Sequence, residues 1–103
     1  MKFVLKHLYL HSRNKEIKEL IFKSFNESYH IRYQVAKHKS TPIPVLDFLS
    51  KDKDFYVRIA VTRNHNTPDY ILERLSKDKN KNVRAYANFK VNIEMDNLTN
   101  KKS

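Results

Sequence analysis

The sequence contains no cysteine, no glycine and no tryptophan. Without cysteine the chain can form neither disulfides nor thiolate-ligated zinc or iron-sulfur sites. This absence fits a reducing compartment, and we therefore expect a cytoplasmic protein. Without glycine the chain cannot build a glycine-rich phosphate loop or a dinucleotide fingerprint. Most nucleotide-dependent enzymes are thereby excluded.

Long apolar runs are also missing. The most apolar stretch near the N-terminus, residues 2–10, is short and is interrupted by Lys6 and His7. It is too short for a transmembrane span and has no small-residue cleavage site of a signal peptide. We therefore expect a soluble protein that does not enter a membrane.

Acidic residues are scarce relative to basic ones. Twenty-one Lys and Arg against eleven Asp and Glu give the 103-residue chain a formal charge of +10 and a pI near 9.9. Such an excess on a chain of single-domain length favours an anionic partner, with nucleic acid the first candidate. The alternative is that a lysine-rich composition only keeps the protein in solution.

The sequence repeats itself every 26 residues. The repeated positions include Ile31-Arg32, Val57-Arg58 and Val83-Arg84, then Thr41-Pro42 and Thr67-Pro68, and finally Leu46, Leu49, Ser50 and Lys51, which recur as Leu72, Leu75, Ser76 and Lys77. A period of this length is typical of stacked supersecondary units that bury their apolar faces against one another. The repeat therefore predicts the architecture more directly than it predicts a ligand.

Each repeat unit reads as two helices. Ser28, Asp54 and Asn80 are N-cap residues that predict first helices over 29–38, 55–64 and 81–90. Threonine as N-cap followed by proline predicts second helices over 42–50 and 68–76. A weaker copy predicts helices over 3–11 and 15–25. The apolar spacing predicts a core that includes Leu46, Leu49, Val57, Leu72, Leu75 and Val83.

The segment Val-Arg-Ile-Ala-Val-Thr-Arg-Asn-His-Asn-Thr-Pro-Asp-Tyr-Ile-Leu-Glu-Arg-Leu-Ser-Lys-Asp-Lys-Asn, residues 57–80, resembles the variant leucine-rich repeat family and its HEAT-like relatives. The resemblance implies a right-handed α-solenoid that is used as a binding surface. We therefore expect an all-α fold, a short right-handed solenoid or superhelix of about three and a half two-helix repeats. Its single domain would cover residues 1–98, with a degenerate capping repeat (1–27), repeats at 28–53 and 54–79, a partial repeat (80–98) and a flexible tail (99–103).

One cation recurs in each first helix. These cations are Lys6, Arg32, Arg58 and Arg84. In the structural interpretation, which we favour, each Arg pairs with a nearby turn acid, as Asp54 and Arg58 would at i, i+4, and holds repeat to repeat. In the functional interpretation, the same residues follow the phosphates of a nucleic acid.

Other cations lack a nearby acid that could pair with them. Lys37 and Arg63 stand one period apart at the turns between first and second helices, with Lys39 and His65 beside them and Arg13 at the corresponding earlier turn. Lysines at the opposite turns form a second cluster that Asp52, Asp54 and Asp78 partly neutralise. The candidate ligand-binding residues are Arg13, Lys37, Lys39, Arg63, His65, Lys77, Lys79 and Lys81.

No residue pattern indicates catalysis. His7 and His11 stand four apart on a predicted helix, but no acid completes a zinc site, and we expect no metal or cofactor. The sequence therefore predicts a non-enzymatic binding module that holds nucleic acid or another polyanion electrostatically. The alternative is a protein adaptor or inhibitor that binds an acidic partner protein, one that could belong to a nucleic-acid-handling complex.

Overall fold

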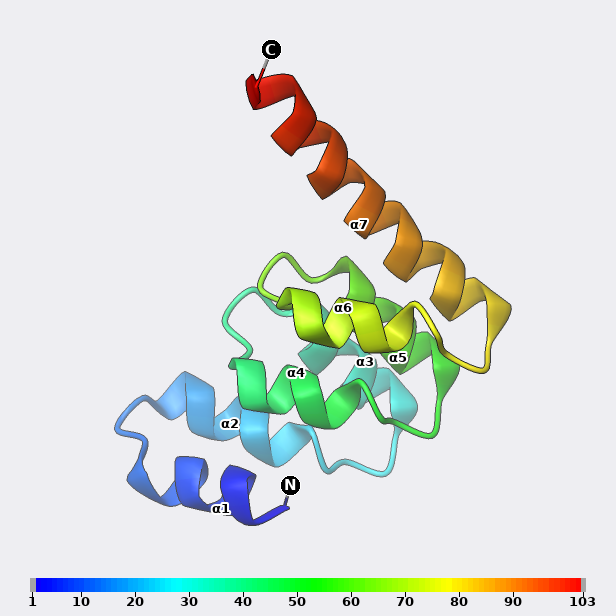
Figure 1. The fold of residues 1–103 in the computed structure, drawn as a ribbon. Coiled ribbons are helices and arrows are strands. Elements are labelled where there is room, and N and C mark those ends of the chain that lie inside the picture. The colour runs from blue at the N-terminus through cyan, green and yellow to red at the C-terminus, as the bar shows by residue number, and fades with distance from the viewer. Residues whose placement is uncertain (1, 103) are drawn as a thin grey trace.

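The computed structural model describes the backbone of residues 2–102 and the side chains of residues 2–98. Within this range the chain folds into seven helices and no strand (Figure 1). The helices are α1 (Lys2–His11), α2 (Lys15–Lys23), α3 (Tyr29–Lys37), α4 (Ile43–Leu49), α5 (Phe55–Arg63), α6 (Asp69–Leu75) and α7 (Lys81–Lys102). The all-α class predicted from the repeat is confirmed.

The first helices of the repeats, α3, α5 and α7, begin where their N-caps predict. The Asp54 carboxylate accepts a hydrogen bond from the backbone N–H of Tyr56 at 2.8 Å, and the Asn80 amide oxygen accepts one from Asn82 at 2.8 Å. These bonds satisfy amide groups that have no partner within the helix. Ser28 occupies the same position before α3 without a side-chain bond.

The threonines before the second helices have a different role from the predicted one. Pro42 and Pro68 are the N-caps of α4 and α6, and neither cap makes a side-chain bond. The hydroxyl groups of Thr41 and Thr67 instead donate backwards, to the carbonyls of Val35 and of the equivalent Val61, at 2.6 Å. A threonine hydroxyl can donate as well as accept. Each buried threonine therefore uses its hydroxyl to bond the preceding helix across the turn, and it does not cap the helix that follows.

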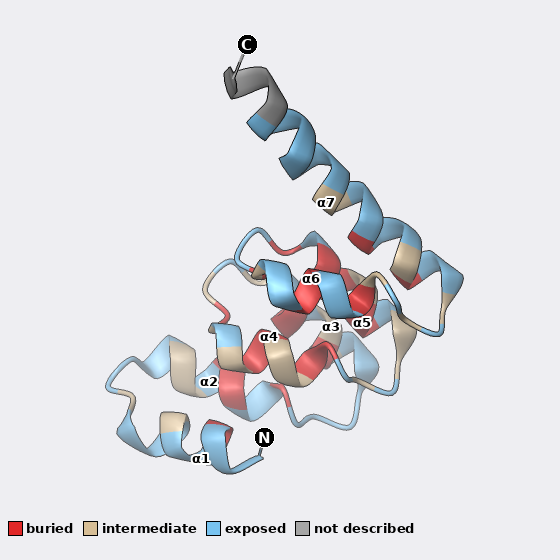
Figure 2. Ribbon diagram, viewed as in Figure 1, coloured by how far each residue is buried: buried red, intermediate tan, exposed pale blue. Residues whose placement is uncertain are grey.

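The helices form two layers in Figure 1, with α4 and α6 in front of α3 and α5. Helix α5 packs between α3 and α7, while α6 packs against α7. The buried residues face the space between the layers (Figure 2), and all six predicted core positions are buried. Helix α1 departs from this series, because it packs against α2 and α4.

The C-terminal part of the chain is one long helix. Helix α7 continues through the position where the turn of a third repeat would fall, so the partial repeat predicted at 80–98 is not divided into two helices. Ile93 and Glu94 replace the Thr-Pro pair of the earlier repeats, and without proline nothing stops the helix. Residues 99–102, assigned to a tail from sequence, continue α7, and Ser103 lies outside the described residues. The outer half of α7 projects from the other helices (Figures 1 and 2).

Candidate binding groove

Two buried arginines connect consecutive repeats. Arg32 Nε and Nη2 donate to the two carboxylate oxygens of Asp52 at 2.8 and 3.1 Å. Arg58 makes the same two-pronged bond to Asp78 at 2.9 and 3.2 Å, and its Nη1 donates to the Asp52 carbonyl at 2.7 Å. Each arginine therefore reaches the acid that lies 20 residues further along the chain, in the turn of the next repeat. These geometries are those of strong bidentate ion pairs.

The pairing of Arg58 with Asp54 predicted from sequence is wrong. Spacing along a helix favoured Asp54, but its carboxylate is used for capping, and Arg58 extends to the next turn. Arg84 donates to the Asp78 carbonyl and makes no carboxylate pair within the described residues. Lys6 is exposed and also has no ion pair there. The four recurring cations therefore fall into two groups. Arg32 and Arg58 form the buried bidentate pairs, which we call the arginine clamps, whereas Lys6 and Arg84, at the two ends of the series, form none within residues 2–98.

A second connection lies at the opposite end of the same helices, where Asn64 is buried. Its amide Nδ2 donates to the carbonyls of Ala36 and His38 in the preceding repeat, at 2.8 and 3.0 Å. Lys90, one period after Asn64, donates from Nζ to the Asn64 carbonyl. Because both ends of α3 are tied to α5, the side chains projecting between these helices have a fixed relative position.

The exposed cations Lys37 and Arg63 line one concavity between α3 and α5, together with Tyr33 and Ala60. This concavity, the cationic groove, has a volume of about 180 Å³ and no acidic residue in its lining. The ammonium of Lys37 lies 5.1 Å from the centre of the Tyr33 ring, within the range of a cation–π contact. The structure therefore brings together the two candidate cations that the repeat placed one period apart.

A larger cavity of about 520 Å³ adjoins the cationic groove and shares Arg63 with it. The Arg63 guanidinium lies 5.7 Å from the centre of the Tyr86 ring on α7. The remaining lining residues are Thr62, His65, Phe89, Lys90, Ile93, Glu94 and Asn97. Burial lowers the pKa of the Lys90 ammonium below its ordinary value of 10.5, although Glu94 and Asp69 act in the opposite direction.

The acidic residues are unevenly distributed around the molecule. Asp52 and Asp78 are held in the arginine clamps, and Asp47 pairs with Arg74. By contrast, the sequence has no Asp or Glu from 28 to 46, nor in the α5–α6 turn. The turns that follow α3 and α5 therefore contribute no carboxylate of their own, although Glu94 of α7 lines the larger cavity together with Arg63 and His65.

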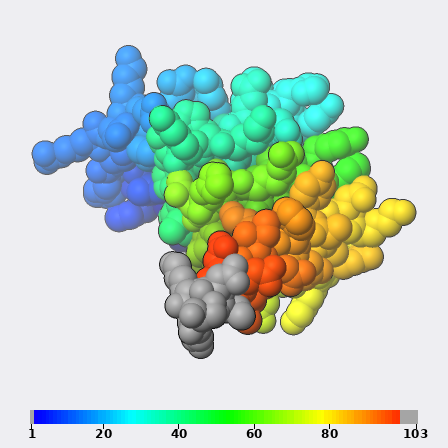
Figure 3. Space-filling model, turned by 90° about the horizontal axis from the view of Figure 1, so that it is seen from above, coloured from blue at the N-terminus to red at the C-terminus, as the bar shows by residue number. Residues whose placement is uncertain are grey.

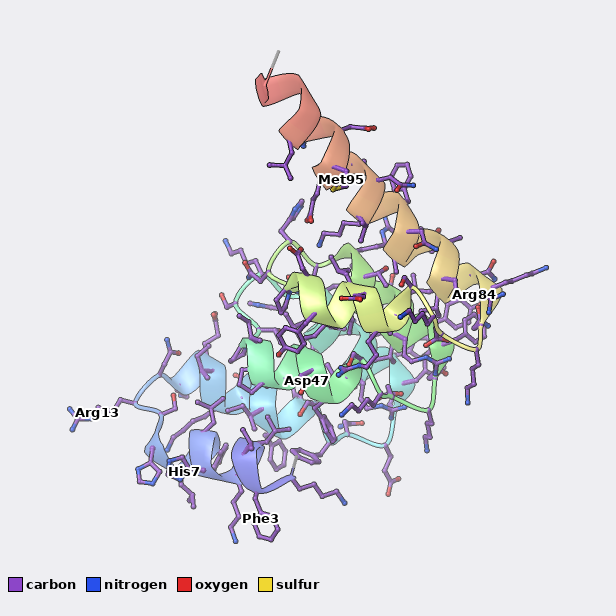
Figure 4. The ribbon with its side chains drawn as sticks, viewed as in Figure 1. Phe3, His7, Arg13, Asp47, Arg84 and Met95 are labelled. Atoms are coloured by element: carbon purple, nitrogen blue, oxygen red, sulfur yellow. The ribbon has the colours of Figure 1, made fainter. Side chains whose placement is uncertain are left out.

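The remaining candidate residues are separated from the cationic groove. Arg13 projects from the α1–α2 turn, at the end of the molecule remote from α7 (Figure 4). Lys77 and Lys79 line a shallow hollow at the α6–α7 turn together with Asp52 and Asp78, and Lys81 is exposed at the start of α7. Lys39 is exposed next to the groove, and its carbonyl accepts a bond from Asn66 at 2.6 Å. The structure thus brings Lys37 and Arg63 together, with His65 in the adjoining cavity and Lys39 on the α3–α4 turn, and leaves the others apart.

Three residues of this region were not predicted as site residues. Tyr86, Phe89 and Lys90 lie in the helix predicted over 81–90, where aromatic side chains are more often found filling the gaps between repeats. The spacing of His38, Asn64 and Lys90 by 26 residues was a usable signal for the second connection. This spacing is hard to recognise in the sequence because the three side chains differ in chemistry.

The residues that the structure describes were also compared with the requirements of a metal site and of a membrane span. The rings of His7 and His11 lie with their centres 4.2 Å apart and their planes tilted by 38°, yet residues 2–98 contain no group of three or more potential metal ligands. In the described part of the chain, no helix combines the length and the apolarity needed to cross a membrane.

Comparisons with known proteins do not extend this description. A scan against protein-family models and searches of curated proteins and of solved structures found no match to the chain.

Proposed function

We propose that this chain is a non-enzymatic binding module, built as a short right-handed α-solenoid, whose cationic groove binds nucleic acid or another polyanion. One observation carries the proposal. Lys37 and Arg63 are exposed, lie one repeat apart, line the same concavity and have no acid beside them in that lining. An arrangement of this kind attracts the phosphates of a nucleic-acid backbone.

The packing of the helices supports a curved array. The contacts of α5 with α3 and with α7 are the most extensive between any two elements, whereas α4 and α6 approach each other less closely. A layer of closely packed helices forms the shorter, concave side of a solenoid. In the proposed superhelix, α3, α5 and α7 therefore line the concave face, which also contains the cationic groove.

The groove favours binding to phosphates over the recognition of bases. Neighbouring packed helices lie about 8–10 Å apart, and this separation sets the spacing of Lys37 and Arg63. The rings of Tyr33 and Tyr86 restrict the two cations, so less side-chain freedom is lost when a phosphate binds. The groove lining holds no Asn or Gln to read adenine edges, and its two cations are assigned to phosphates, so we expect little sequence specificity.

The test compares two charge-reversal variants. Lys37→Glu with Arg63→Glu should weaken binding of single-stranded and duplex oligonucleotides, measured by fluorescence anisotropy at several salt concentrations. It should also reduce the slope of log affinity against log salt by roughly one to two units, as the loss of about two phosphate contacts requires. The matched control is Lys53→Glu with Lys79→Glu, because these exposed lysines are also one period apart but lie at the opposite turns.

We expect the control variant to keep most of the affinity. If it loses binding and the groove variant does not, the opposite turns form the site and the cationic groove does not. If the unmodified protein fails to bind any oligonucleotide at low salt, the nucleic-acid proposal is wrong. Circular dichroism of each variant checks that the helical fold is retained.

A specific observation favours a second candidate, an acidic protein partner. In the adjoining cavity Phe89 is 65% exposed and lies on the same helix as the exposed Ile93 and Tyr86, next to Arg63. Aromatic and arginine side chains dominate the binding energy of many protein interfaces. A protein partner would remain bound at salt concentrations that release oligonucleotides, and Phe89→Ala would weaken it more than Lys37→Glu.

A further inference from the structure

A groove between α6 and α7 brings together acidic residues of this basic chain, within the residues that the structure describes. We call it the acidic groove. It has a volume of about 290 Å³ and is lined by Asp69, Glu73, Ser76, Asn88, Val91, Glu94, Met95 and Leu98. Three of these residues are acids and none is a base, although the whole chain carries a formal charge of +10. The groove therefore suits a partner that is apolar and basic.

The equivalent positions of the preceding repeat show which kind of side chain binds at such a groove within the molecule. One period earlier, Asp47 of α4 and Ser50, the C-cap of α4, correspond to Glu73 and Ser76. Arg74, on the following second helix α6, binds both Asp47 and Ser50. Its Nη2 donates to the Asp47 carboxylate at 2.5 Å and also to the Ser50 hydroxyl. An acid and a serine at these positions are thus the receptor for a cation from a following helix.

At Glu73 and Ser76 this receptor is unoccupied by any described side chain. Ser50 is 3% exposed because the next repeat covers it, whereas Ser76 is partly exposed. Glu73 is exposed and forms no ion pair within residues 2–98. Leu98, beside it on α7, is 55% exposed. The acidic groove is therefore a half-built contact between repeats.

Helix α1, at the other end of the molecule, has the complementary chemistry. It contains Lys2 and Lys6 and no acidic residue. Phe3 is 87% exposed and Leu10 is 61% exposed, and Figure 4 shows Phe3 directed away from the body of the protein. The concavity between α1 and α2 is also mainly apolar and is bordered by the same two lysines. This end thus offers an apolar, basic helix to a partner.

We propose that copies of this chain associate head to tail, with α1 of one copy bound in the acidic groove of the next. A lysine of α1 then takes the place that Arg74 has inside the molecule, and Phe3 and Leu10 cover Val91 and Leu98. The two surfaces lie at opposite ends of the molecule (Figures 1 and 3), so one copy cannot satisfy both by itself. Unlike patches that meet in this way produce rings or open chains, not closed two-fold dimers.

A charge exchange between the two surfaces tests this arrangement. The unmodified chain should show a mean mass that rises with concentration in sedimentation and light-scattering measurements made without nucleic acid. Glu73→Lys and, separately, Lys2→Glu with Lys6→Glu should each weaken association about ten-fold or more, because like charges then face each other. An equimolar mixture of the two variants should associate again, because each mixed contact pairs opposite charges.

The controls reverse charges outside both surfaces. Glu27→Lys and Lys53→Glu alter exposed residues in other turns and should leave association unchanged. A monomeric unmodified chain at all concentrations would overturn the proposal, as would a mixture that stays monomeric although both variants keep their helical spectra. Because Lys37 and Arg63 are intact in every variant, oligonucleotide binding measured on the same samples keeps this outcome separate from that of the proposed function.

Discussion

Replacing Arg58 by alanine should cost about 3–5 kcal/mol of folding stability, because it breaks a buried ion pair. Arg58 is 5% exposed, and its removal leaves the Asp78 carboxylate without its main partner and the Asp52 carbonyl without the Nη1 donor. Asp78 keeps one compensating bond, from the backbone N–H of Asn80 at 2.8 Å, which prevents a larger loss. Small domains are stable by about 5–15 kcal/mol, so this single change would remove a large fraction of the total.

Urea unfolding followed by circular dichroism measures the loss. The matched control is Arg84→Ala, because Arg84 occupies the same repeat position but only donates to the Asp78 carbonyl and is partly exposed. We expect Arg84→Ala to cost about 0.5–1.5 kcal/mol, the contribution of an ordinary hydrogen bond. Equal losses in the two variants would refute the argument, because stability would then depend on the arginine at this position and not on the clamp. Arg58→Met with Asp78→Leu should lose less than Arg58→Ala alone, since no unpaired charge remains buried.

Two further substitutions test the core and the second connection between repeats. Leu72→Ala should destabilise the protein by about 2–5 kcal/mol, because the side chain is fully buried, and a loss of a few tenths in chemical unfolding would mean that the core is wrongly placed. Asn64→Ala should cost about 1–3 kcal/mol, because the carbonyls of Ala36 and His38 lose their donor. The exposed Asn66→Ala is its comparison in the same unfolding assay, and a larger loss there would contradict the role given to Asn64.

The helices and the core were predictable because equivalent positions recur in the sequence, so each prediction of burial or capping is supported by more than one residue. Val57 and Val83 are both buried at equivalent places, and the N-caps of α5 and α7 lie where the spacing placed them. Prediction failed where the repeat ends. The sequence predicted that the first helix of the last repeat ends near residue 90, but helix α7 continues because Glu94 has replaced proline and no residue there breaks a helix.

The site was predictable only in part. The 26-residue spacing was enough to bring Lys37 and Arg63 to one concavity, because equivalent positions on packed helices project in the same direction. The partner of Arg58 was not predictable from spacing along one helix, since the acid that binds it is 20 residues away in the next turn. The contribution of Tyr86 depends on how α7 crosses α5, which no local pattern specifies.

The two connections between repeats, one at each end of α5, would allow repeats to be added or removed. Arg58 and Asn64 each reach a residue whose position is set by the repeat period, so duplication of residues 54–79 would supply every donor with an acceptor of the same type. The added unit would also supply one more arginine equivalent to Arg63 and extend the cationic groove by one helix spacing, about 8–10 Å. If the cationic groove binds a polyanion as proposed, chains of this design can change the length that they cover by gaining or losing whole repeats, while the contacts between repeats stay the same.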